Sequence, residues 1–147
     1  MKGISNGQVI DADKEYAVAE EYRKKLKTKC PTVEQNVGNL SGGNQQKVLL
    51  AKWMFAEPDI LILDEPTRGI DVGAKYEIYC IINDLVAAGK SVIMISSELP
   101  EVLGMSDRIY IMNEGRFVGE VSGEEATSEL ILSLIHISEP TRQAEIS

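Results

Sequence analysis

The chain has 147 residues, a formal net charge of −8, 44% hydrophobic residues and 26% charged residues. This length and composition are typical of one globular domain with a modest core. The negative charge argues against nonspecific nucleic-acid binding, which depends on lysine and arginine side chains that neutralise phosphates. No apolar run approaches the roughly 18 to 20 residues that span a bilayer, so we expect membrane association to come from a partner protein.

The first half of the chain predicts two helices. Apolar residues recur at helical spacing over residues 13–29, in a segment without Gly that Pro31 then stops. A second segment without Gly or Pro predicts a helix that ends near residue 56. Its apolar stripe, with Trp53, is expected to pack in the core, and Lys47 and Lys52 are expected on the solvated side.

The second half predicts an α/β arrangement. An apolar strand, a helix ended by Gly89 and a second apolar strand form a strand-helix-strand unit, which implies parallel pairing. A short helix follows, and then two strands flank a turn signal, which predicts a hairpin. The expected segments, in chain order, are residues 60–63, 73–88, 91–96, 98–104, 108–112 and 117–121.

Two glycines precede the second helix in the run Leu40-Ser41-Gly42-Gly43-Asn44-Gln45-Gln46-Lys47. Without Cβ atoms, Gly42 and Gly43 would let backbone N–H groups approach an anion, and the helix N-terminus would point at the same spot. Ser41 would add a hydroxyl donor. The alternative interpretation is an ordinary loop in which Ser41 only caps the helix.

Two carboxylates end the first predicted strand in the run Ile60-Leu61-Ile62-Leu63-Asp64-Glu65-Pro66-Thr67. The continuous apolar run predicts a strand buried on both faces of a largely parallel sheet, and such sheets bind ligands at the carboxyl ends of their strands. In phosphoryl transfer, Asp64 could hold Mg²⁺ and Glu65 could orient or deprotonate the attacking water. The alternative is a solvated acidic turn after a core strand.

Together these segments resemble the distal half of an ATP-binding-cassette (ABC) ATPase. Ser41, Gly42 and Gly43 match its signature loop, Asp64 and Glu65 match its Walker B pair, and Asp71 matches its D-loop aspartate, in the family's order. The sequence of residues 44–47, 67–75 and 95–103 is similar to that of the second cassette of monosaccharide importer ATPases of the multiple-sugar, galactose and xylose type. The resemblance covers about residues 1–131.

The resemblance implies an incomplete P-loop NTPase cassette, α/β in class, with a largely parallel sheet, flanking helices and a C-terminal β-hairpin. It implies that Ser41, Gly42, Gly43, Asn44, Asp64 and Asp71 bind ATP with Mg²⁺ and that Asp64 holds the metal. It also implies that Glu65 and Ser97 are catalytic. Most ABC ATPases carry histidine at the switch position, where this chain has Ser97. A hydroxyl can donate one hydrogen bond but cannot carry an imidazolium charge.

The sequence contains no Gly-x-x-x-x-Gly-Lys-[Ser/Thr] motif, so the P-loop that would cradle the β- and γ-phosphates is not among these residues. We therefore expect a fragment that alone neither binds ATP tightly nor hydrolyses it. ABC cassettes pair head to tail, which implies that the signature loop completes a site on a second cassette. The alternative is a catalytically inactive interaction module that lends its signature loop to a partner cassette.

The implied function is to energise monosaccharide import from the cytoplasmic face of the membrane. The implied partners are a second cassette, membrane permease subunits and, indirectly, a periplasmic or extracellular sugar-binding protein, with no nucleic acid.

Residues 132–142 resemble the in-frame translation of a transposon-end sequencing adapter, so we expect residues 132–147 to be a non-native tail and give His136 no role. The alternative is a natural helix from Glu124 that continues the pattern of Leu130, Ile131 and Leu134. Cys30 and Cys80 form no Cys-x-x-Cys pair, which predicts neither a zinc site nor a redox motif. We expect both to be buried or half-buried.

Overall fold

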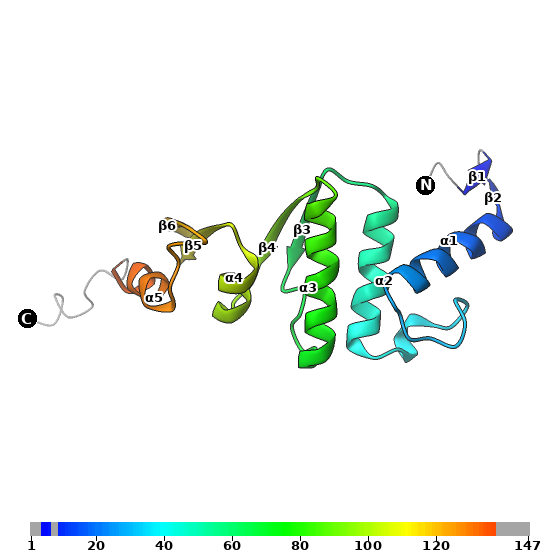
Figure 1. The fold of residues 1–147 in the computed structure, drawn as a ribbon, viewed down its shortest axis with the longest axis horizontal. Coiled ribbons are helices and arrows are strands. Elements are labelled where there is room, and N and C mark those ends of the chain that lie inside the picture. Colours follow the sequence, from blue (N-terminus) through cyan, green and yellow to red (C-terminus); the bar gives the residue numbers. More distant parts are fainter. Residues whose placement is uncertain (1–3, 7–8, 138–147) are drawn as a thin grey trace, which may run out of the picture. The chain divides into compact units, whose positions relative to one another are not determined.

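A computed structural model describes residues 4–6 and 9–137, which fall into two compact units that divide between Ile95 and Ser96. The first contains four strands, three α-helices and a short 3-10 helix η1 among its described residues (Figure 1). These are β1 Ser5–Asn6, β2 Val9–Ile10, α1 Ala12–Lys25, η1 Val37–Asn39, α2 Gly42–Phe55, β3 Ile60–Asp64, α3 Val72–Ala87 and β4 Ser91–Ile95.

The centre of this unit is β3–α3–β4. The two strands pair in parallel, with Ile62 opposite Ile93 and Asp64 opposite Ile95, which confirms the predicted strand-helix-strand unit. Gly89 ends the connection from α3 with φ of +87°, a backbone conformation that favours glycine. The buried side chains come from one face of β3 and from α3, and are Leu61, Leu63, Ile78, Ile81 and Ile82.

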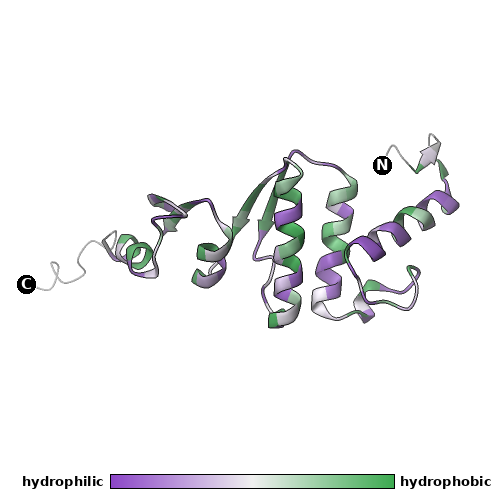
Figure 2. Ribbon diagram, in the orientation of Figure 1, coloured by the Kyte–Doolittle hydropathy of each residue, from purple (hydrophilic) through white to green (hydrophobic). Residues whose placement is uncertain are grey.

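The other face of this sheet is uncovered. Ile60 is 61% exposed and Ile62 is 63% exposed, and Ile93 and Ile95 of β4 are also exposed. Figure 2 shows β3 and β4 as hydrophobic along their length. The prediction that the strand is buried on both faces is therefore wrong for this chain, because the described helix that packs against the pair, α3, covers only one face.

Helix α1 ends earlier than the sequence predicts. Asp11 caps its start by accepting from the Lys14 N–H, and the helix stops at Lys25 rather than near Pro31. Lys27 takes a positive φ of 51°, and the Thr28 N–H donates to the Arg23 carbonyl at 2.9 Å. This backbone closure resembles a Schellman motif, which satisfies the last carbonyls and ends the helix without proline.

Helix α2 contradicts two expectations about its environment. Lys47, expected in solvent, is 2% exposed, whereas Trp53, expected in the core, is 46% exposed. The face that α2 buries carries Lys47 and Leu50 instead. Lys47 is buried there because its ammonium pairs with the Glu77 carboxylate on α3. Cys80 on α3 is also exposed, so the expectation of a buried or half-buried thiol holds only for Cys30.

The second unit contains α4 Leu99–Met105, β5 Arg108–Asn113, β6 Arg116–Ser122 and α5 Ser128–Ile137. The predicted hairpin is confirmed: β5 and β6 pair antiparallel, and Glu114 and Gly115 at its tip both have positive φ, as a type I′ turn requires. Its core joins both strands to α5 through Ile109, Ile111, Val121 and Ile131.

Residues 132–137 belong to α5, where Leu134 and Ile135 pack against this core. A helix is thus present in this region, but it begins at Ser128 and not at Glu124 as the alternative interpretation expects. The origin of residues 132–147 stays a prediction, and residues 138–147 lie outside the described part. Among the helices that the structure describes, none combines the length and apolar character needed to cross a membrane.

Candidate functional site

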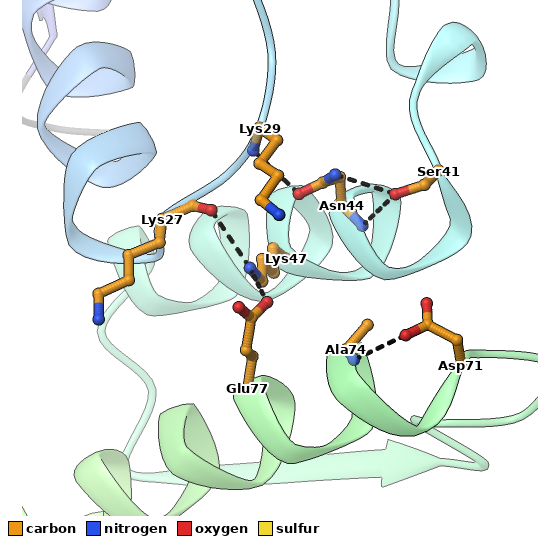
Figure 3. A network of polar contacts seen from close by, with 8 residues as sticks. All are labelled: Lys27, Lys29, Ser41, Asn44, Lys47, Asp71, Ala74 and Glu77. Atoms are coloured by element: carbon orange, nitrogen blue, oxygen red, sulfur yellow. Dashed lines mark hydrogen bonds and ion pairs between the residues drawn. The ribbon is translucent and has the colours of Figure 1, made fainter.

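The first wall of the candidate site is the loop that starts α2. Ser41 has extended backbone angles and caps the helix, its Oγ accepting from the Asn44 backbone N–H at 3.4 Å and from Asn44 Nδ2 at 2.9 Å (Figure 3). A hydroxyl oxygen offers two lone pairs and one hydrogen. Because Asn44 supplies donors to the oxygen, the hydroxyl hydrogen is what Ser41 can present to a ligand. The capping interpretation and the ligand interpretation are therefore compatible.

The two glycines have different surroundings. A Cβ atom at Gly42 would have no neighbour within 4 Å, whereas one at Gly43 would lie 2.6 Å from Ala74 Cβ of α3. Gly43 is thus needed for the close approach of α2 to α3, whose N-terminal turns lie side by side. Gly42 is where the backbone is open to an incoming group.

The second wall is the start of α3. Asp71 caps this helix, its Oδ1 accepting from the Ala74 N–H at 3.0 Å. Ser41, Gly43, Asn44 and Asp71 all line one cavity of about 270 Å³. The cavity is completed by Lys29, Lys47, Gly73, Ala74 and Glu77. The structure therefore brings Ser41, Gly43 and Asn44 together with Asp71, beside two helix N-termini that favour anions, whereas Gly42 does not line this cavity.

Sequence reasoning missed the charged pair at the base of this cavity. The Lys47 ammonium donates to Glu77 Oε2 at 2.5 Å and to the Lys27 carbonyl at 3.2 Å (Figure 3). The hydrogen bond from Lys47 holds the pKa of Glu77 below its ordinary value. Desolvation acts in the opposite direction and raises this pKa, whereas the positive charges of Lys47, Lys29 and Lys27 also lower it. The helical spacing of the sequence placed Lys47 on α2, but it could not indicate that Lys47 pairs with a carboxylate on α3.

The carboxylates Asp64 and Glu65 do not line this cavity and lie at the carboxyl end of β3. Asp64 is exposed and Glu65 is half-buried. Glu65 has a positive φ of 46° and its N–H donates to the Ile95 carbonyl at 2.9 Å, so the end of β4 fixes a backbone conformation that non-glycine residues seldom adopt. Such conformations concentrate at functional sites.

Within the described ranges, no cluster of three or more His, Cys, Asp or Glu side chains could hold a metal. An exposed carboxylate such as Asp64 still suits Mg²⁺, which takes one or two carboxylates together with water and substrate phosphates.

Ser97 belongs to the second unit and is exposed, just before α4. The neighbouring Ser96 accepts the Glu98 N–H on its Oγ at 3.1 Å, which turns the chain into that helix.

Comparison with known proteins identifies similar chains. The model of the ABC transporter family matches residues 4–68. The chain is 65% identical over 132 residues to the L-arabinose transport ATP-binding protein AraG of Geobacillus stearothermophilus, covering 90% of this chain and 26% of that protein. It is 58% identical over 125 residues to the ribose import ATP-binding protein RbsA of Clostridium perfringens, strain SM101, covering 85% and 25%. The chain thus spans about a quarter of the length of the curated relatives it matches.

Solved structures agree with these matches. The ADP conformation of MJ1267, an ATP-binding cassette of an ABC transporter, aligns with a TM-score of 0.71 and 26% identity, over 95% of this chain and 54% of that one. The resemblance that the motifs indicated is therefore confirmed: residues 4–68 match the ABC transporter family, and the chain has the fold of part of an ABC ATPase cassette.

Proposed function

We propose that this chain is part of the ATP-hydrolysing subunit of an ABC-type monosaccharide importer. The observation that carries the proposal is the shared cavity of Ser41, Asn44 and Asp71, in a chain that is 65% identical to an arabinose transport ATP-binding protein. The two relatives described above name arabinose and ribose as their cargo, so the proposed substrate class is a monosaccharide.

In this proposal the cavity faces a nucleotide bound by the P-loop of a second cassette. The Ser41 hydroxyl donates to the terminal phosphate, and the open backbone at Gly42 lets phosphate oxygens approach the N-terminus of α2. Asn44 orients Ser41, and Asp71 shapes the same wall by capping α3. These groups act across an interface between cassettes.

Asp64 and Glu65 serve the P-loop of their own cassette. Asp64 would hold Mg²⁺, which would neutralise charge on the transferred phosphoryl group when bound. Glu65 orients the attacking water and accepts its proton, and the hydrogen bond from its N–H to the Ile95 carbonyl fixes its backbone at the strand end. Ser97 supplies a hydroxyl donor at the switch position.

The remaining assignments follow from this role. The partners are a second cassette, permease subunits in the membrane and, through the permease, a sugar-binding protein outside it. The location is the cytoplasmic face of the membrane. Residues 1–131 form the distal part of the nucleotide-binding domain, and residues 132–147 are the adapter-derived tail.

The test compares ATP hydrolysis by the 147-residue chain with that by the full-length subunit that contains it. The chain alone is expected to show no turnover, because it carries no P-loop motif. The full-length subunit is expected to hydrolyse ATP. Glu65→Gln, combined with the matching substitution in the second cassette, is expected to lower kcat by two orders of magnitude or more, roughly the contribution of a positioned general base. Turnover by the chain alone, or full activity without Glu65, contradicts the proposal.

A further inference from the structure

The buried charge at the base of the cavity has no role in the proposed chemistry. Lys47 is 2% exposed, and its ammonium lies between α3 and the segment that follows α1. A buried ion pair adds little net stability relative to apolar packing, because desolvation offsets the attraction. A lysine at this position is therefore better explained by what it fixes in place than by the stability it adds.

The contacts of Lys47 fix three segments relative to one another. One helical turn before it, on the same face of α2, Asn44 Oδ1 accepts the Lys29 N–H at 3.0 Å. Lys47 itself donates to the Lys27 carbonyl and to Glu77. The first two turns of α2 are thus joined twice to residues 27–29 and once to α3 (Figure 3).

These contacts connect Lys47 to the residues that cap the N-termini of α2 and α3. Asn44 is the residue whose amide donates to Ser41 Oγ, so an Asn44 held by Lys29 orients the Ser41 hydroxyl. Glu77 lies on α3 between one and two turns after Asp71, which caps that helix. A contact between Lys47 and Glu77 therefore sets the spacing of Ser41 and Asp71 across the cavity.

We infer that Lys47 and Glu77 are positioning residues, a clamp that holds Ser41 at the geometry required in the transition state. This inference rests on the proposed function. Loss of Lys47 leaves Ser41 present but misplaced, and a misplacement of about 1 Å costs on the order of 100-fold in rate. The loss falls on kcat with KM for ATP unchanged, because the clamp does not contact the nucleotide's main binding groups.

The test is a double-mutant cycle in the full-length subunit. Lys47→Met, which keeps the aliphatic length, is expected to lower kcat on the order of 10- to 100-fold when Ser41 is present. In a Ser41→Ala background the same change is expected to alter kcat by less than about twofold, since there is no hydroxyl to position. Lys52→Met, an exposed lysine on the same helix, is the matched control and leaves kcat unchanged.

A merely structural lysine would lower kcat by the same factor in both backgrounds, and that result, or no loss in either, overturns the inference. A second measurement separates it from the proposed function. In the 147-residue chain, Lys47→Met is expected to speed hydrogen exchange of the Lys29 amide at least about tenfold, and Lys52→Met is not. Unchanged exchange overturns the clamp, whereas a wild-type subunit without ATP turnover overturns the proposed function alone.

Discussion

Adjacent glycines in the signature loop provide a direct test of how α2 packs on α3. Alanine at Gly43 would place a Cβ atom 2.6 Å from Ala74 Cβ, closer than two methyl groups can approach, so the helices must separate. Alanine at Gly42 would meet nothing within 4 Å. Both positions lie in the first turn of the same helix, and neither has positive φ.

The magnitude follows from the difference between the two variants. Replacing glycine by alanine in a helix adds up to about 1 kcal/mol of stability, and this gain is nearly common to both sites. Overpacking costs about 1 to 3 kcal/mol. Gly43→Ala is therefore expected to be less stable than Gly42→Ala by about 1 to 3 kcal/mol, with Gly42→Ala at or above wild type.

Urea unfolding of the 147-residue chain measures this difference. With a slope of about 1 to 3 kcal/mol per molar urea, the midpoints of the two variants should differ by roughly 1 M. Wild type is the reference, and the slopes should agree if all three proteins unfold from the same structure. A Gly43→Ala protein as stable as Gly42→Ala would refute the close helix packing at Ala74.

Three further predictions concern stability. Glu77→Gln is expected to destabilise the chain by at least about 1 kcal/mol more than Lys47→Met in urea unfolding. The glutamine leaves the buried Lys47 ammonium without its counter-charge, whereas the methionine leaves a half-exposed carboxylate in water. Equal losses would contradict the burial of Lys47. The pKa of Glu77 is lowered in the folded chain, so the stability that the Glu77 carboxylate contributes is present above the ordinary value of 4.5 and is lost as pH falls through the lower folded pKa. Unfolding measured from neutral pH downward should show the difference in stability between wild type and Glu77→Gln closing below about 4.5. A constant difference would be inconsistent with the ion pair. Gly123→Ala is expected to lower stability by about 1 to 3 kcal/mol, because its Cβ would lie 2.2 Å from the Ser106 carbonyl oxygen. Gly104→Ala, whose Cβ would have nothing within 4 Å, should be neutral or stabilising. Thermal unfolding of both variants measures the difference.

Local patterns predicted the elements that local rules govern. The apolar runs and the helical segment between them predicted β3, α3 and β4, and the turn at Glu114 and Gly115 predicted the hairpin, because glycine and its neighbour could take positive φ there. The end of α1 was predicted too late, since its closing hydrogen bonds at Lys27 and Thr28 carry a weaker sequence signal than proline.

Features that depend on packing between elements could not be predicted. The burial of Lys47 depends on Glu77, which is thirty positions away and becomes its neighbour only when α2 packs on α3. An apolar strand predicts two buried faces, but whether Ile62 is covered depends on what packs there. The meeting of Ser41 and Asp71 in one cavity was not predicted either, because it too arises only when α2 packs on α3.

In the proposed function, these residues belong to an ATPase that drives monosaccharide import. The most direct measurement is uptake of labelled arabinose, xylose, ribose or galactose into vesicles that contain the full-length subunit, its permease and the sugar-binding protein. The account predicts uptake of at least one of these sugars that requires ATP and is abolished by Glu65→Gln. ATP hydrolysis without uptake of any monosaccharide, or uptake that does not depend on Glu65, would contradict it.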